Sequence, residues 1–187
     1  ALVGLVPVSR MQLALPGKQL TESTPRRYWE RNIWGRVMTM VFQHADEALN
    51  MHSSVEESLR QLPLRDRMTI GMVADKLGEL YDPESVPALL RKKVWMLSGG
   101  QKQKLNLLRG LLLDTAFLIL DEPLNGLDFE SCRRFVGLLR KKLTEGKGVL
   151  VISHNEEIFD ALVSDDDLYY LHLHAPLRTR LDHGSAR

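Results

Sequence analysis

A short apolar run that ends in two acids constrains the fold of this chain more than any other feature. Phe117 to Leu120 are four apolar residues in a row, which is typical of a strand buried on both faces. Asp121 and Glu122 follow at once, and Pro123 then prevents the strand from continuing. Strands of this kind occur in parallel sheets covered by helices, and such sheets bind ligands at their carboxyl edge. The run therefore predicts an α/β fold with a site beside Asp121 and Glu122.

The two acids at the end of this predicted strand suit phosphate chemistry. One carboxylate at such a place can hold Mg²⁺, usually through water, and the other can orient an attacking water molecule. An ordinary acidic turn would show the same residues. The segment taken alone leaves both interpretations open.

A second feature lies upstream, where Ser98, Gly99 and Gly100 precede a run with apolar residues at helical spacing. Serine is a favourable helix N-cap, and a helix start offers unpaired N–H groups and a partial positive charge. Because glycine has no Cβ, a ligand can approach the backbone closely there. The stretch favours a phosphate site at a helix start, and a plain Gly-Gly turn before a core helix is about as well supported.

Five short motifs occur in the order and at the spacing found in the ATP-binding-cassette (ABC) ATPases. Their counterparts in this chain are the Q-loop glutamine Gln43, the signature motif at 97–103, the Walker B strand at 117–122, the D-loop at 125–128 and the switch histidine His154. The chain thus resembles this family from about residue 1 to about residue 173.

The resemblance implies an α/β fold like that of the P-loop NTPases, with a layered αβα core, a small antiparallel β edge and a helical subdomain. Residues 1–50 and 97–175 would form the RecA-like ATPase core, residues 51–96 the helical subdomain and residues 176–187 a frayed tail. The family's phosphate-binding loop, Walker A, does not occur in the sequence. We therefore expect a core that is truncated just after that loop and does not hydrolyse ATP alone.

The resemblance also implies a role for each site residue. Glu122 would activate the attacking water as the catalytic base, while Gln43 and His154 would sense the terminal phosphate. Mg²⁺ would be held by Asp121 and Gln43. The residues implied to contact ATP are Ser98, Gly99, Gly100, Gln101 and Asp128.

The implied function is ATP binding and hydrolysis by an ABC transporter subunit that drives solute transport. The implied partners are a second ATPase domain, arranged head to tail, and a membrane permease that holds the chain at the cytoplasmic face of the membrane. Residues 48–50 are similar to the peptide- and nickel-importer ATPases of the family. Two alternatives stay open: a soluble ABC ATPase of translation or DNA repair, and a non-catalytic cassette that serves as an interaction module.

Composition excludes some other classes. The net charge is +1, with acidic and basic residues interspersed, so no broad nucleic-acid-binding surface is expected. No apolar run approaches the roughly 18 residues of a membrane span. The single cysteine, Cys132, rules out a framework of disulfides within the chain.

Local patterns predict the remaining elements. Ser54 and Glu57 form a capping box at a helix start. Asp128 can cap a helix that begins at Phe129. Three methionines, Met68, Met72 and Met96, are compatible with an adaptable binding face, but we expect them to fill a small core, which is the commoner role. The expected strands lie at 11–15, 37–42, 149–153 and 168–173, and the expected helices at 54–62, 65–81, 129–143 and around 158–162.

Overall fold

The computed structural model describes residues 4, 9–15, 17–64, 68–154, 169–174 and 178–183 of the 187-residue chain. Residues 1–153 and 154–187 form two separate compact units. The helix expected around 158–162 lies outside the described residues. Among the helices described in these ranges, none is long and apolar enough to cross a membrane.

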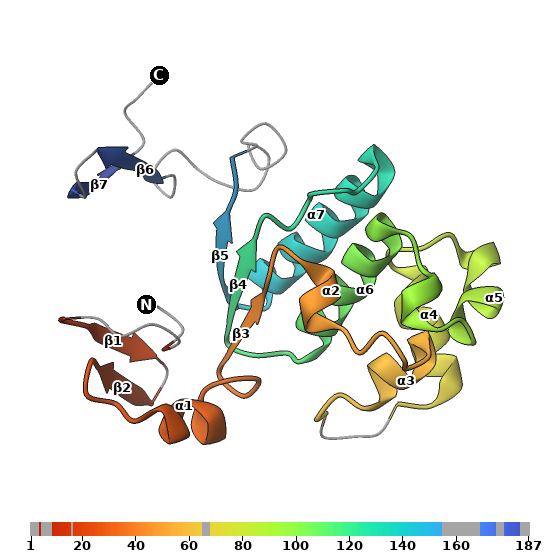
Figure 1. Cartoon of the computed structure of the whole chain (residues 1–187), viewed down its shortest axis with the longest axis horizontal. Coiled ribbons are helices and arrows are strands. Elements are labelled where there is room, and N and C mark those ends of the chain that lie inside the picture. The colour runs from red at the N-terminus through yellow and green to blue at the C-terminus, as the bar shows by residue number, and fades with distance from the viewer. Residues whose placement is uncertain are drawn as a thin grey trace. The chain divides into compact units, whose positions relative to one another are not determined.

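The first unit combines strands with helices, and a run of helices separates β3 from β4 in the sequence (Figure 1). Its elements are β1 (Gln12–Leu15), β2 (Lys18–Thr21), α1 (Arg26–Asn32), β3 (Met38–Val41), α2 (Ala45–Ala48), α3 (Val55–Arg60), α4 (Ile70–Gly78), η1 (Pro83–Ser85), α5 (Val86–Leu90), η2 (Val94–Met96), α6 (Gly99–Leu112), β4 (Phe117–Asp121), α7 (Phe129–Thr144) and β5 (Gly148–Ile152). The second unit contains β6 (Tyr169–His174) and β7 (Arg178–His183).

Three parallel strands in the order β3-β4-β5 form the sheet at the centre of the first unit. Val41 is paired with Leu120, and Asp121 is paired with Ile152. The carboxyl ends of all three strands therefore meet at one edge. The sheet confirms the α/β fold expected from the sequence, and β1 and β2 form the expected small antiparallel ladder.

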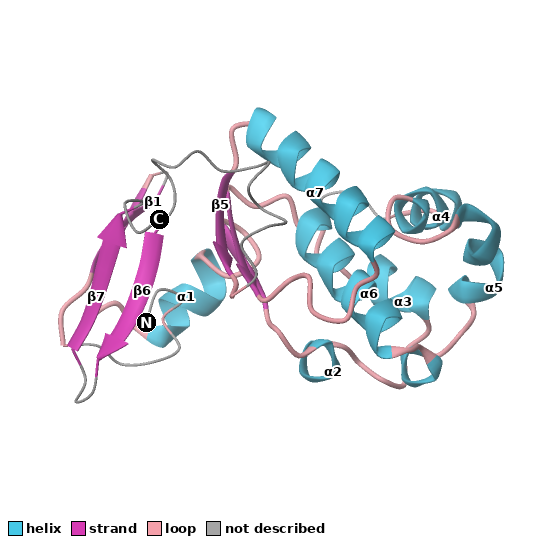
Figure 2. Cartoon of the chain, turned by 90° about the horizontal axis from the view of Figure 1, so that it is seen from above, coloured by secondary structure: helices cyan, strands magenta, loops and turns pink. Residues whose placement is uncertain are grey.

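The apolar run of β4 is buried because the sheet is covered on both faces. On one face, Ile119 packs with Trp29 of α1, whose side chain is only 2% exposed. On the other face, Val41 and Leu118 lie against Gly110 of α6, where an added Cβ would clash with Val41 Cγ2. Figure 2 shows α1 on one side of the sheet, with α6 and α7 on the other.

The described residues of 51–96, namely 51–64 and 68–96, contain short helices that pack on one another and on α6. The predicted capping box starts α3, since Ser54 Oγ accepts a hydrogen bond from Glu57 N at 3.1 Å and Glu57 Oε2 accepts one from Ser54 N at 2.6 Å. The whole block belongs to the compact unit 1–153. The division into an ATPase core and a helical subdomain stays a prediction.

The expectation that three methionines fill the core is wrong for two of them. Met68 is buried, but Met72 and Met96 are 47% and 52% exposed. The buried face of α4 is formed by Val73 and Leu77, four residues apart. Met72 lies one residue before Val73 and therefore points about 100° away from that face.

The expected frayed tail at 176–187 is also wrong, because it contains β7. This strand pairs antiparallel with β6, from Tyr169 opposite His183 to His174 opposite Arg178. Chain ends fray unless main-chain hydrogen bonds tie them down, and here the ladder with β6 supplies those bonds.

Candidate functional site

The carboxyl edge of the sheet brings together three of the predicted site residues. Asp121 is the last residue of β4 and Glu122 follows it, while Gln43 comes two residues after the neighbouring strand β3. Both acids are half-buried, and Gln43 is exposed. The strands therefore place a carboxylate pair and an amide at one open edge, as the sequence predicts.

Glu122 is held in an uncommon backbone conformation by the neighbouring strand β5. Its φ angle is +45°, in the left-handed region that residues with a Cβ seldom adopt. Its N–H donates to Ile152 O at 2.8 Å, and its Oε2 accepts a hydrogen bond from Ser153 Oγ at 3.3 Å. Strain of this kind is retained where the surrounding structure imposes it, often at functional sites. The sequence did not reveal the contact with Ser153.

The signature motif forms the start of α6, where Ser98 and Gly99 are exposed to solvent. Ser98 Oγ accepts a hydrogen bond from Gln101 N at 3.3 Å, and Gln101 Oε1 accepts one from Ser98 N at 3.1 Å. Ser98 is thus the predicted N-cap, and Gln101 completes a capping box. The Ser-x-x-Gln spacing carried this second signal, which our sequence analysis missed.

The two signature glycines have different surroundings. A Cβ added at Gly100 would lie 2.5 Å from the main-chain oxygen of Gly126 in the D-loop. A Cβ added at Gly99 would meet nothing within 4 Å. The start of α6 therefore contacts the D-loop through Gly100, while Gly99 leaves an open surface that a ligand can approach.

A buried amide joins α6 to the loop after β4. Gln103 is 4% exposed, and its Nε2 donates a hydrogen bond to Pro123 O at 3.1 Å. This bond fixes the signature helix beside the two acids of the edge. Gln103 lies four residues before the buried Leu107, and this helical spacing was the sequence signal for the contact.

Replacement of Gln103 by methionine should lower the free energy of unfolding by about 1–3 kcal/mol, because Pro123 O would lose its buried partner. Urea unfolding of the chain measures this change. Gln61→Met, at an exposed position at the end of α3, is the matched control. It should leave the free energy of unfolding within about 0.5 kcal/mol of that of the unmodified chain. Equal effects of the two changes would show that the Gln103 bond does not stabilise the fold.

Side chains of α6 also hold the segment that carries Gln43. Asn106 Nδ2 donates a hydrogen bond to Phe42 O at 3.2 Å. Lys102 Nζ lies 2.8 Å from Asp46 Oδ1. The signature helix is thus connected to the Q-loop segment as well as to the loop after β4.

A cavity of about 400 Å³ opens beside this segment, between β3, α2 and α6. Phe42 and Leu113 contribute apolar lining, and Arg109 lines it with a cation. Among the described residues, Thr39 Oγ1 and Arg109 Nε are buried without a hydrogen-bond partner. Burial lowers the pKa of Arg109. The Arg109 guanidinium is held in place by Nη1, which donates a hydrogen bond to Ala48 O at 2.9 Å.

Asp128 uses its carboxylate to cap α7. Its Oδ1 accepts a hydrogen bond from Ser131 N and its Oδ2 accepts one from Ser131 Oγ, both at 2.8 Å, while Lys104 Nζ lies 3.7 Å from Oδ2. These contacts, the main-chain N–H of Ser131 first, lower the pKa of Asp128. The predicted cap is confirmed, and a contact of Asp128 with ATP stays a prediction.

His154 begins the second compact unit and directly follows Ser153. Its expected role beside Glu122 stays a prediction.

The donors at the carboxyl edge fit a magnesium ion that carries its own water. Among the residues that the structure describes, no group of three or more acids, histidines or cysteines could hold a metal. Mg²⁺ keeps several waters and is usually bound by one or two carboxylates together with substrate phosphates. Asp121, with the amide of Gln43 just after the neighbouring strand β3, matches that requirement.

The parallel sheet is covered on both faces and has two acids at its carboxyl edge, next to a glycine-containing helix start. Together these features define a phosphate-binding α/β protein. A family model described as "ABC transporter" matches residues 1–125. The chain belongs to this family.

Two relatives are nickel import ATP-binding proteins. LarO of Lactiplantibacillus plantarum is 32% identical over 66% of this chain and 51% of its own length. NikD of Pseudomonas putida is 34% identical over 77% of this chain and 55% of its own length. The chain thus spans about half the length of these relatives.

Solved structures share the fold. A dimeric ATP-binding cassette in a post-hydrolysis state, bound to ADP and Pi, superposes with a TM-score of 0.68 at 19% identity, over 83% of this chain and 68% of its own. CbiO1 from Clostridium perfringens, part of the ABC transporter complex cbiONQ, gives a TM-score of 0.60 at 21% identity, over 83% of this chain and 61% of its own. These likenesses confirm the predicted P-loop NTPase-like α/β fold.

Proposed function

We propose that this chain is the ATP-binding and ATP-hydrolysing part of an ABC transporter subunit. The observation that carries this proposal is the carboxyl edge, where β5 holds Glu122 and Asp121 lies beside it. Family membership and the relatives named as nickel import ATP-binding proteins support it. The two relatives are named for nickel import rather than for translation or DNA repair.

The signature motif would act on the nucleotide of a second ATPase domain in a head-to-tail dimer. Ser98 and Gly99 are exposed at the start of α6, where main-chain N–H groups and the helix dipole attract phosphate oxygens. Gly99 leaves room for the phosphates, and Gly100 keeps the D-loop against the same helix start. One chain thus contributes half of each of two nucleotide sites.

Glu122 would act as the general base in hydrolysis. Its carboxylate accepts a proton from water while the water oxygen bonds to the terminal phosphorus, and the bond to the bridging oxygen breaks to give ADP and phosphate. Mg²⁺, held through water by Asp121 and Gln43, would neutralise charge on the phosphates. Gln43 and His154 would orient the terminal phosphate.

The native subunit is the protein as its own gene encodes it. Measuring ATP hydrolysis by the native subunit tests this function. Phosphate release from ATP should require Mg²⁺ and should stop when a chelator removes the ion. The reason is that Mg²⁺ neutralises the charge on the phosphates during the reaction. Restoring Mg²⁺ should restore the rate. A native subunit that binds ATP without hydrolysing it would instead support the non-catalytic cassette.

The partner in the membrane would be a permease that docks at the 400 Å³ cavity and the neighbouring helical block. The cavity is lined by β3 residues and by Phe42, the residue before Gln43. A permease bound there could therefore shift Gln43 at the nucleotide site. The chain would then lie at the cytoplasmic face of the membrane, and nickel is the transported solute that the named relatives favour.

Cysteine crosslinking of the assembled transporter tests this docking site. In a background with Cys132 replaced by alanine, cysteines at Phe42 and Met51 should capture the permease. Cysteines at Arg133 and Arg140, exposed on α7, are the matched controls and should not. Capture from α7 alone would place the permease on another face.

A further inference from the structure

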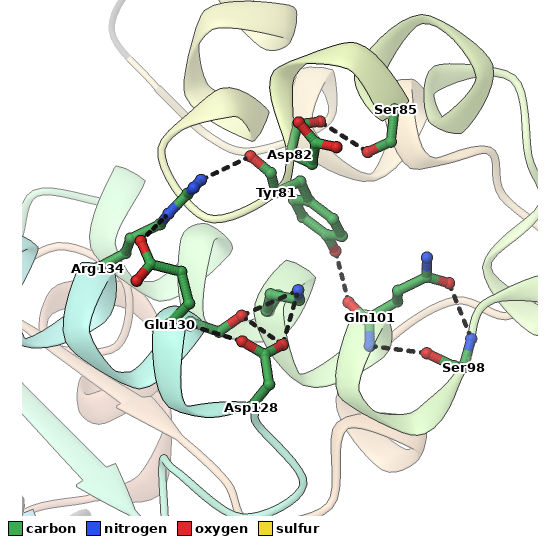
Figure 3. A network of polar contacts seen from close by, with 10 residues as sticks. Tyr81, Asp82, Ser85, Ser98, Gln101, Asp128, Glu130 and Arg134 are labelled. Atoms are coloured by element: carbon green, nitrogen blue, oxygen red, sulfur yellow. Dashed lines mark hydrogen bonds and ion pairs between the residues drawn. The ribbon is translucent and has the colours of Figure 1, made fainter.

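Three segments that are distant in the sequence meet at Tyr81 (Figure 3). Tyr81 lies just after α4 in the helical block and is 2% exposed. Its hydroxyl donates a hydrogen bond to the main-chain oxygen of Gln101, in the first turn of α6. Burial raises the pKa of Tyr81, so the hydroxyl remains protonated and a donor at neutral pH. The helical block is thereby bonded directly to the signature motif.

Lys104 extends this connection to the D-loop. Its Nζ lies 5.1 Å from the centre of the Tyr81 ring, a cation–π distance. The same Nζ donates a hydrogen bond to Ser131 Oγ at 3.1 Å and lies 3.7 Å from Asp128 Oδ2. The Lys104 side chain is only 15% exposed, whereas that of Asp128 is 65% exposed, so water reaches the ion pair from the Asp128 side. One cation thus joins the tyrosine ring, α6 and the residue that ends the D-loop.

Arg134 makes a third contact from α7. Its Nη1 donates a hydrogen bond to Tyr81 O at 3.1 Å, and its Nε donates one to Glu130 Oε1 at 3.1 Å. Tyr81 is therefore held by α6 through its hydroxyl and by α7 through its main chain. A displacement of the helical block would be transmitted to both helix starts.

We propose that Tyr81 and Lys104 are positioning residues that hold the signature motif and the D-loop in register with the helical block. This inference rests on the proposed function, in which both motifs meet a nucleotide shared with a partner subunit. The physical basis of the inference is the orientation of the start of α6, because main-chain N–H groups there bind phosphate only when they point at it. Tyr81 fixes the first turn of α6, and Lys104 fixes the D-loop to that same helix. Through them, docking on the helical block would change how well two subunits enclose ATP.

The test measures the ATP-dependent dimer of the native subunit carrying Glu122→Gln, which retains bound ATP. Adding Tyr81→Phe removes only the hydroxyl, and the dissociation constant of the dimer should rise about 3- to 10-fold, the usual effect of one lost hydrogen bond. The affinity of a single subunit for ATP should not change. Ser85→Ala is the matched control, since Ser85 Oγ donates a hydrogen bond to Asp82 O at 2.7 Å within the same block. It should leave the dimer unchanged.

A second pair of variants keeps the test decisive if Tyr81→Phe does not fold. Lys104→Met should weaken the dimer in the same direction, and Lys104→Arg, which keeps the cation, should restore most of the affinity. Unchanged dimer dissociation in Tyr81→Phe or Lys104→Met, with only the unfolding temperature lowered, would overturn the inference. If Glu122→Gln with Tyr81 intact formed no ATP-dependent dimer, the proposed function would fail first and this inference with it.

Discussion

Replacing Glu122 by glutamine should lower ATP hydrolysis by the native subunit about 100-fold or more, the usual scale for losing a positioned general base. The amide has nearly the same shape but is a far weaker proton acceptor. ATP binding should persist, because no phosphate contact is removed. Steady-state phosphate release and equilibrium nucleotide binding measure the two effects separately.

Asp114→Asn provides the matched control for this change. Asp114 is also an acid with a positive φ, +49° against +45° for Glu122, but it precedes β4 at the opposite end of that strand. Its carboxylate pairs with Lys142 and Lys147. Asp114→Asn should keep full activity. Similar losses in the two variants would mean that negative charge near either end of β4, rather than a base at its carboxyl end, supports hydrolysis.

Alanine at Gly100 should destabilise the chain, whereas alanine at Gly99 should not. The Cβ at Gly100 would press on the main-chain oxygen of Gly126, which cannot move without shifting the D-loop. We expect a loss of about 1–3 kcal/mol in unfolding free energy, typical of overpacking. Gly99→Ala has open space around its Cβ and should stay within about 0.5 kcal/mol of the unmodified chain. Urea unfolding measures both.

Hydrolysis by the same two variants separates internal packing from ligand binding. Gly99→Ala should reduce the rate at least 10-fold despite normal stability, because its Cβ would occupy the surface left open for the partner's phosphates. Gly100→Ala should lose activity together with stability. Full activity of Gly99→Ala would show that the exposed start of α6 does not meet the nucleotide, and normal stability of Gly100→Ala would contradict the contact with Gly126.

Much of the fold could be predicted because its signals are local. The apolar run of β4 required burial on both faces, and a sheet between α1 and α6 provides it. The capping box of α3 depends on residues three apart, so its spacing alone was sufficient. Pairing of β7 with β6 had no comparable local signal, and the tail at 176–187 was therefore expected to fray.

The candidate site divides in the same way. Asp121 and Gln43 could be placed at one edge because parallel strands end together. The left-handed backbone conformation of Glu122 could not be predicted, because it depends on a hydrogen bond to β5, about 30 residues further along the chain. Tyr81 was missed for a related reason, because its partners on α6 and α7 are brought to it only by the packing of the helical block.

Sedimentation of the native subunit carrying Glu122→Gln, with and without ATP and Mg²⁺, tests the central claim most directly. If the signature motif and the catalytic glutamate act on nucleotides bound between two subunits, a block in hydrolysis should leave the ATP-bound dimer closed. We predict a stable dimer with ATP and Mg²⁺ and a monomer when either is omitted or when Ser98→Arg is added. A Glu122→Gln protein that remains monomeric with ATP and Mg²⁺, or that hydrolyses ATP at the unmodified rate, would contradict the account.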